Sequence, residues 1–175
     1  KLPAFITGGG QENGNRSGTE NTQGISGLGL ATELAYDNLA EKQRHIINLN
    51  NRLREGLMSE LDDIIVNGTI DMGVDVSDYG KRFPSVLNIS FLGARGEVIL
   101  HTLEQDEIFV STGSACSSHK NSDSHVLAAM GLGHKEIEGA IRFSISEFNT
   151  LEEMDEAAAK VSAAVKRFRR LGSFR

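Results

Sequence analysis

Residues 141–146 read Ile-Arg-Phe-Ser-Ile-Ser, a strict alternation of apolar and polar side chains. A period of two is typical of a β-strand with one buried face. The pattern predicts that Ile141, Phe143 and Ile145 face a core, while Arg142 points to the opposite face. A second stretch, Val-Leu-Asn-Ile-Ser-Phe at residues 86–91, predicts another strand in which apolar and polar positions also separate onto two faces. Both strands are expected to belong to one small sheet.

Helical patterns account for most of the chain around these strands. From about Ile25 to Leu61 the pattern is helical, with leucines four apart from Leu49 to Leu61, and a pattern of this length predicts either one bent helix or two helices in sequence. The other expected elements are helices at 96–103, at 125–130 and from a capping-box sequence at Thr150 onward, and short strands at 64–66 and 108–110. Three or four strands with four or five helices predict an α+β domain, with a small mixed or antiparallel sheet flanked by helices and a long N-terminal helix.

Composition limits the function classes. The 175 residues are 39% hydrophobic and 24% charged, as in one globular domain, and the net charge of −6 argues against nucleic acid as the main partner. No apolar stretch approaches the roughly 18 residues of a membrane span, and no signal segment opens the chain. A single cysteine cannot form an internal disulfide, which favours a reducing compartment. We therefore expect a cytoplasmic protein without direct nucleic-acid or membrane binding.

The single cysteine, Cys116, lies in a polar stretch, Ser-Thr-Gly-Ser-Ala-Cys-Ser-Ser at residues 111–118, and is followed by His119 and Lys120. This composition predicts a solvated loop. Nearby cationic groups favour the thiolate form of a cysteine, which is the nucleophilic form. From composition alone, a nucleophile and an exposed but chemically idle thiol remain equally open.

Arginine and hydroxyl side chains offer two candidate sites for an anion. Arg142 sits in the middle of a predicted strand, and its planar fork suits a carboxylate or phosphate, although a solvated surface arginine fits the pattern as well. The segment Arg16-Ser17-Gly18-Thr19 combines a guanidinium, hydroxyls and an accessible backbone, as phosphate-binding loops do, but glycine-rich loops are common. The five histidines do not form a metal set, since a zinc site needs about four ligands and the other thiols are absent.

Taken together, these segments resemble the cysteine desulfurases of the NifS/IscS type, which are fold-type I pyridoxal-phosphate enzymes of the class V aminotransferase family. The resemblance covers essentially the whole chain. The motifs that carry it are Gly-Gly-Gly-Gln-Glu at 8–12, Arg-Ser-Gly-Thr-Glu-Asn at 16–21, residues 82–91, Gly96-Glu97, Ser-Ala-Cys at 114–116, Ser-His-Val-Leu at 124–127 and Ile-Arg-Phe-Ser at 141–144. The long polar loop around the cysteine matches the first of the family's two groups, in which the catalytic cysteine lies on a flexible loop.

The resemblance implies an activity and roles for three residues. Enzymes of this family take sulfur from L-cysteine, release L-alanine and leave a persulfide on their own cysteine, for iron–sulfur cluster assembly or for thio-cofactor and tRNA biosynthesis. Cys116 matches the cysteine that accepts the sulfur, and Arg142 matches the arginine that binds the substrate carboxylate. Thr19 matches a threonine that reaches the phosphate of pyridoxal 5′-phosphate in the neighbouring subunit of a homodimer.

One departure from the family is large. The family's cofactor-binding lysine, its ring-stacking histidine and its aspartate all precede the first glycine run, so this chain is expected to be the C-terminal portion only. Lys1 belongs to the connecting segment and not to the lysine motif. Residues 1–24 are expected to end the large cofactor domain and form a linker, and residues 25–175 are expected to form the small domain that carries the cysteine loop. The portion alone is expected to be inactive and to bind no cofactor.

Two other functions stay open at this point. The chain could be a non-catalytic persulfide carrier that docks on a scaffold or sulfur-acceptor protein. It could also belong to a related enzyme that uses the same cofactor, such as a selenocysteine lyase or an aminotransferase.

Overall fold

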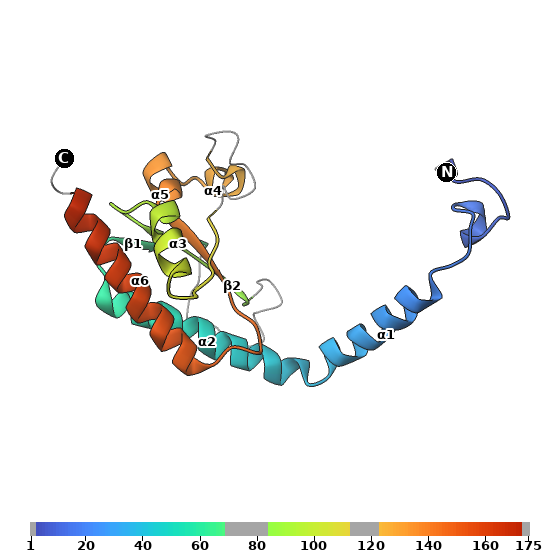
Figure 1. Cartoon of the computed structure of the whole chain (residues 1–175), viewed down its shortest axis with the longest axis horizontal. Coiled ribbons are helices and arrows are strands. Elements are labelled where there is room, and N and C mark those ends of the chain that lie inside the picture. Colours follow the sequence, from blue (N-terminus) through green and yellow to red (C-terminus); the bar gives the residue numbers. More distant parts are fainter. Residues whose placement is uncertain (1–2, 69–83, 113–122, 173–175) are drawn as a thin grey trace. The chain divides into compact units, whose positions relative to one another are not determined.

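The structure is a computed structural model that describes residues 3–68, 84–112 and 123–172. Cys116 and its neighbours at 113–122 therefore lie outside the described residues. The chain forms two compact units, Lys1–Leu39 and Ala40–Arg175. Figure 1 traces the elements of both units along the chain. The predicted boundary at residue 24 assigns the first segment to a larger domain, and that assignment stays a prediction.

The second unit is built on a three-stranded antiparallel sheet. Its strands are β1 (Ile64–Val66), β2 (Val86–Phe91) and β3 (Ala140–Ser144), in the order β1-β2-β3. Leu87 lies opposite Phe143 and Ile89 opposite Ile141, and all four side chains are buried. The period-of-two pattern is therefore confirmed, and the sheet is purely antiparallel.

Three helices complete the core on the apolar face of the sheet. They are α2 (Leu39–Glu60), α3 (Gly96–Glu104) and α6 (Leu151–Gly172). The leucines of α2 that recur four apart are fully buried and belong to the same hydrophobic cluster as Ile99 of α3 and Val161 of α6. None of the described helices combines the length and the apolar composition that crossing a membrane requires.

The opposite face of the sheet is covered at one end and open at the other. Ser90 is fully buried, whereas Arg142 and Ser144 are exposed and Asn88 is half-buried. These side chains all belong to the face that the sequence predicted to be polar. Arg142 is thus held on a rigid strand whose other face is packed into the core.

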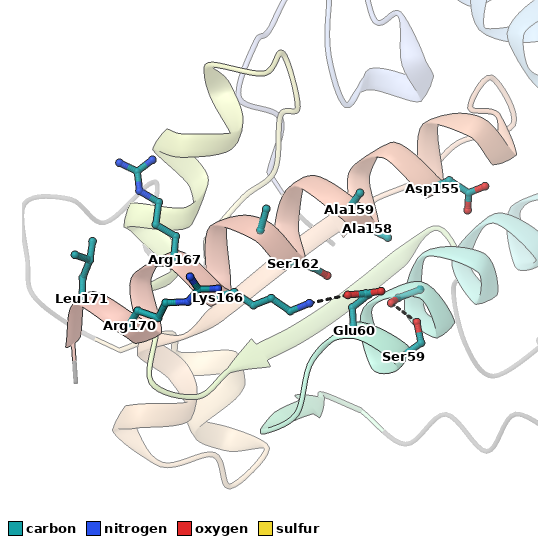
Figure 2. A pocket seen from close by; sticks show the side chains of 12 residues that line it. Ser59, Glu60, Asp155, Ala158, Ala159, Ser162, Lys166, Arg167, Arg170 and Leu171 are labelled. Carbon is teal, nitrogen blue, oxygen red and sulfur yellow. Dashed lines mark hydrogen bonds and ion pairs between the residues drawn. The ribbon is translucent and has the colours of Figure 1, made fainter. Parts of the chain in front are cut away.

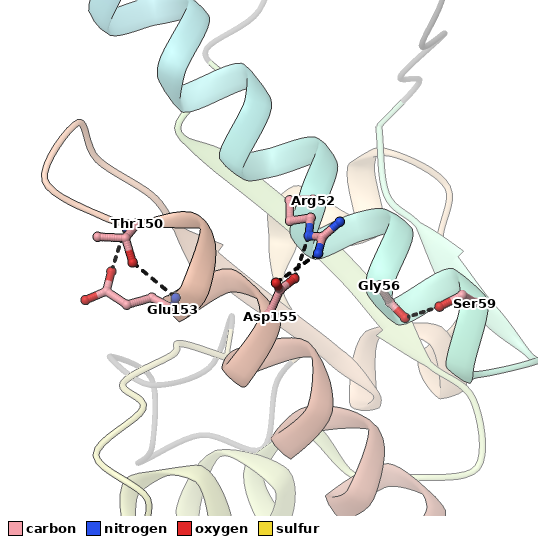
Figure 3. A network of polar contacts seen from close by, with 6 residues as sticks. All are labelled: Arg52, Gly56, Ser59, Thr150, Glu153 and Asp155. Atoms are coloured by element: carbon pink, nitrogen blue, oxygen red, sulfur yellow. Dashed lines mark hydrogen bonds and ion pairs between the residues drawn. The ribbon is translucent and has the colours of Figure 1, made fainter.

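Helices α2 and α6 run in the same direction and are joined by polar contacts (Figure 3). Arg52 donates two hydrogen bonds to Asp155, at 2.5 and 2.9 Å, and these hold the pKa of the Asp155 carboxyl below its ordinary value. The helices approach closely at Gly56, where an added Cβ would lie 2.9 Å from that of Ala158. The predicted capping box is also present, since Thr150 and Glu153 exchange hydrogen bonds of 3.0 and 3.2 Å.

The helical pattern from 25 to 61 is two helices rather than one. Helix α1 (Thr22–Tyr36) begins at the side chain of Asn21, which accepts a hydrogen bond from the backbone N–H of Gly24. The chain then turns through Asp37 and Asn38, and Asn38 has a φ of +52°. A left-handed residue interrupts the helical hydrogen bonds, so α2 starts anew at Leu39.

Two other features differ from the sequence prediction. Residues 108–110 do not form a strand, because this extended segment meets β3 only at the isolated bridge between Ser111 and Arg142. A short helix, α5 (His134–Glu138), follows α4 (His125–Ala129) and was not predicted. It brings the described α-helices to six, one more than the upper expectation.

The guanidinium of Arg169 ties the end of α6 to the sheet. It donates hydrogen bonds to the backbone carbonyls of Asp62, Asp63 and Leu92 at 2.7, 2.9 and 2.8 Å. We predict that Arg169→Ala lowers the free energy of unfolding by about 1–3 kcal/mol, since three hydrogen bonds from a charged donor are lost, one of them at the half-buried carbonyl of Leu92. Urea unfolding of the chain measures this, and Arg169→Lys should recover only part of the loss because it lacks the fork. Arg170→Ala is the matched control; an equal effect of both changes would contradict the role.

Gly139 immediately precedes β3 and packs against the backbone at the end of β2. A side chain does not fit there. An added Cβ would be 2.5 Å from the Phe91 carbonyl oxygen and 3.1 Å from that of Ala94. We predict that Gly139→Ala destabilises the chain by about 1–3 kcal/mol, because backbone atoms must shift to relieve the overlap. Gly29→Ala, on a helix position where an added Cβ meets nothing within 4 Å, should cause no loss. Similar melting temperatures for the two variants would refute this account of Gly139.

Candidate functional site

A row of four polar residues crosses the exposed face of the sheet. Asn67 follows β1, Asn88 lies on β2, Arg142 lies on β3, and Ser111 pairs with Arg142 from beyond the sheet edge. We call these four residues the polar row. The backbone N–H of Asn67 donates to the Asn88 carbonyl at 2.8 Å, and Asn88 lies directly opposite Arg142. Antiparallel pairing therefore places the four side chains on one face, in neighbouring positions.

The pairing of Ser111 with Arg142 fixes where the cysteine-bearing segment begins. The Arg142 N–H donates to the Ser111 carbonyl at 2.7 Å, and the Ser111 N–H donates to the Arg142 carbonyl at 3.1 Å. Cys116 follows only five residues after Ser111 in the sequence. The sequence prediction named Cys116 and Arg142 separately, and the fold brings the start of the cysteine segment directly beside the arginine.

The residue that follows the other end of that segment contacts α5, the helix that precedes β3 in the chain. Asp123 forms a hydrogen bond of 2.8 Å with His134, at the start of α5, which leads directly into β3. The next residue, Ser124, caps α4 by accepting a hydrogen bond of 3.5 Å from the Leu127 N–H. The described residues on either side of 113–122 thus contact β3 at one end and α5 at the other. Cys116 itself lies outside the described residues, so its role stays a prediction.

Arg142 presents a guanidinium that could bind an anion. Its side chain is exposed, and within the described ranges 3–68, 84–112 and 123–172 it has neither a hydrogen-bond nor an ion-pair partner. An arginine without a carboxylate partner on a rigid strand can bind a carboxylate of a ligand through two parallel hydrogen bonds.

Thr19 lies in the first compact unit, in a loop that Arg16 shapes. The Arg16 guanidinium donates to the carbonyls of Gly18 and Thr19 at 2.8 and 3.2 Å. Gly18 has a φ of +112°, a conformation that favours glycine. The Thr19 hydroxyl is exposed and makes no hydrogen bond to another described residue. This hydroxyl is chemically suited to donate to a phosphate oxygen, which is the role predicted for it.

Three of the four histidines that the structure describes contact other side chains or carbonyls of the chain. His45 contacts the Asn149 carbonyl at 3.0 Å, His101 pairs with Glu104 at 2.9 Å, and His134 pairs with Asp123. Among the described residues no three histidine, cysteine or acidic side chains are grouped as metal ligands.

A groove between α2 and α6 contains none of the predicted site residues (Figure 2). Its volume is about 910 Å³, and half of its twelve lining residues are glycine, alanine or serine. Lys166 on α6 forms an ion pair of 2.6 Å with Glu60 on α2. The lining residues are thus mainly small or paired with one another, so the groove adds no group to the polar row.

Sequence reasoning missed Asn67, Asn88 and Ser111 as members of the site. The alternation along residues 86–91 does assign Asn88 to the polar face, but a strand pattern alone does not reveal which residue of another strand lies opposite. The register supplies that information. It was the signal needed to connect Asn88 with Arg142.

Known proteins match this chain over nearly its whole length. The family described as aminotransferase class-V matches residues 7–156. The cysteine desulfurase IscS of Clostridium botulinum strain Hall is 40% identical over 171 residues, which are 98% of this chain and 41% of that protein. A NifS-like protein of Rickettsia africae has a similar solved structure, with a TM-score of 0.72 and 29% identity over 95% of this chain and 41% of that one. Another solved NifS-like protein gives a TM-score of 0.65 and 32% identity over 99% of this chain and 40% of that one.

These matches confirm the predicted resemblance and the α+β fold of a NifS-like domain. The chain spans about two fifths of the length of the curated relatives that it matches. Its sequence motifs, its antiparallel sheet and its match over residues 7–156 agree, and the chain belongs to the aminotransferase class-V family.

Proposed function

We propose that this chain is the part of a pyridoxal-phosphate-dependent cysteine desulfurase that binds the substrate carboxylate and accepts the sulfur. The enzyme converts L-cysteine to L-alanine and leaves the sulfur on Cys116 as a persulfide. The observation that carries the proposal is the backbone pairing of Ser111 with Arg142, because it starts the cysteine segment beside a guanidinium suited to an amino acid's carboxylate. The similarity to cysteine desulfurases supports the same reaction.

Arg142 holds the substrate by its carboxylate. A planar guanidinium binds a carboxylate through two charge-assisted hydrogen bonds, which orient the ligand as well as hold it. The strand fixes the arginine backbone on both edges, through Ser111 on one side and β2 on the other. A rigid anchor of this kind keeps the amino acid in one position while its sulfur is removed.

The cofactor fits the residues that this chain offers. The exposed hydroxyl of Thr19, with no other hydrogen bond in the described part of its loop, is suited to the phosphate of pyridoxal 5′-phosphate, and we propose that it serves the neighbouring subunit of a homodimer. When it is bound, the cofactor supplies an electron sink that weakens the carbon–sulfur bond of the substrate.

Cys116 accepts the sulfur atom. Its thiolate attacks the substrate sulfur, a new sulfur–sulfur bond forms, the carbon–sulfur bond breaks, and the three-carbon product takes up a proton and leaves as alanine. The product on the enzyme is a persulfide, which a second thiol can attack in turn. Glycine and serine beside Cys116 suit a segment that moves between the substrate and an acceptor.

We also propose where the sulfur goes. A sulfur-acceptor or scaffold protein receives it in the cytoplasm, for iron–sulfur cluster assembly or for thiolation. The single cysteine supports a reducing compartment, in which a persulfide can be passed on and the thiol regenerated.

The first test replaces Cys116, the residue proposed to accept the sulfur from the substrate. In an enzyme of the relatives' full length that contains this chain, Cys116→Ser should abolish alanine formation from L-cysteine and leave cofactor absorbance intact, since a hydroxyl cannot accept the sulfur. Alanine is measured by amino-acid analysis, and Ser118→Ala serves as the control. Undiminished alanine formation by Cys116→Ser would remove this residue from the reaction.

The second test concerns the anchor. Arg142→Ala should raise the KM for L-cysteine by about a hundredfold, because two charge-assisted hydrogen bonds are lost. Arg142→Lys keeps the charge but loses the paired donors of the guanidinium, so its KM should lie between those of the wild type and Arg142→Ala. Steady-state kinetics measure both, with the exposed Arg44→Ala on α2 as the control. A KM that changes no more in Arg142→Ala than in Arg44→Ala would show that the carboxylate binds elsewhere.

A further inference from the structure

We infer that Asn88 is a second substrate-binding residue, whose side-chain amide donates to the same carboxylate as Arg142. The inference rests on the proposed function and adds a donor to its anion site. It starts from the register of β2 and β3, in which Asn88 lies directly opposite Arg142.

Backbone hydrogen bonding shows that this pair is the close type. In an antiparallel ladder, pairs that exchange backbone hydrogen bonds alternate with pairs that do not, and side chains of the second kind lie nearer to each other. The N–H and C=O of Arg142 both point away from β2, to Ser111. The Asn88 carbonyl points away from β3, to the Asn67 N–H. Asn88 and Arg142 are therefore a non-hydrogen-bonded pair with adjacent side chains on the open face.

The side chain of Asn67 fixes the orientation of the Asn88 amide. Asn67 Nδ2 donates to Asn88 Oδ1 at 2.6 Å and to Ser90 Oγ at 2.7 Å. Because Oδ1 of Asn88 accepts this hydrogen bond, Nδ2 is the end of the amide that stays available to a ligand, on a residue directly opposite Arg142. The Asn88 amide is thus oriented before any ligand binds, which lowers the cost of binding.

Asn88 and Arg142 offer two neighbouring hydrogen-bond donors, which suit an acceptor group of a ligand. Within the described part of the chain, neither Asn88 Nδ2 nor the Arg142 guanidinium donates a hydrogen bond to another residue. An amide N–H and a guanidinium cannot bond to each other, since both are donors. A carboxylate has two oxygens with about four acceptor positions, so it can take the arginine fork and one more N–H. The amino-acid carboxylate of the proposed substrate satisfies both residues at once.

The test compares two ligands that differ in the carboxylate alone. L-Alanine carries it, and L-alaninamide replaces it with a neutral amide. In the full-length holoenzyme, isothermal titration calorimetry should show that Asn88→Ala raises the Kd of L-alanine about tenfold, the factor of one lost hydrogen bond to a charged group. The Kd of L-alaninamide should stay unchanged. Asn88→Asp should weaken the binding of L-alanine further, because the added carboxylate pairs with the Arg142 guanidinium and repels the ligand's carboxylate.

Three variants complete the experiment. Asn67→Ala frees the Asn88 amide to rotate. We expect a smaller rise of the Kd, about threefold, and for L-alanine only. Asn50→Ala is the matched control, because Asn50 donates to the Pro84 carbonyl at 2.9 Å, away from the polar row. The double variant, with both Arg142→Ala and Asn88→Ala, should raise the Kd of L-alanine by less than the product of the two single-variant factors, since both residues bind one group.

The outcomes separate this inference from the proposed function. An unchanged Kd of L-alanine in Asn88→Ala overturns the inference, and so does an equal rise for both ligands, which would mean that Asn88 only supports the fold. Failure of the wild-type enzyme to bind L-alanine overturns it as well. Alanine formation from L-cysteine is measured separately: its absence in the wild type defeats the proposed function, whereas its presence beside an unaffected Asn88→Ala defeats the inference alone.

Discussion

The pairing of β3 determines the rest of the candidate site, because one strand is held on both edges by different partners. On one side it pairs with β2, which is buried in the core through Leu87 and Ile89. On the other side Arg142 exchanges two backbone hydrogen bonds with Ser111. This arrangement sets the position of the guanidinium, of the amide opposite it and of the start of the cysteine segment. A shift of one residue in this register would turn Arg142 toward the core.

The packing behind the sheet explains why such a shift does not occur. Leucines from α2 and valines from α6 fill the apolar face of the sheet and leave no accessible surface on its central side chains. At Gly139, just before β3, backbone carbonyl oxygens lie too close to allow another register of β2 and β3. Arg169 joins the last helix to three carbonyls at the start of β1 and the end of β2. The exposed face can therefore carry unpaired donors, since the stability of the domain comes from the other face.

The sequence was a good guide wherever a single element carried the signal. Alternation along 86–91 and 141–146 predicted both long strands and the exposure of Arg142, and the leucine spacing predicted the buried stripe of α2. It failed at residues 108–110, because β-branched and aromatic residues favour a strand only where a partner edge continues beside them, and here the pairing stops at Ser111. Helix α5 was missed since five residues carry too little periodicity. The link from Asn88 to Arg142 could not be predicted, because register is a property of two strands.

A fixed anchor and a tethered nucleophile suit the proposed sulfur transfer for a physical reason. The carboxylate must stay in one place while the carbon–sulfur bond breaks, which favours a guanidinium on a strand and an amide already oriented by Asn67. The sulfur, in contrast, must be carried away from that place to an acceptor. The described residues that flank the cysteine segment are held in place, Ser111 by Arg142 and Asp123 by His134. In the proposed reaction, Cys116 carries the sulfur away while Arg142 keeps its place on the paired strand.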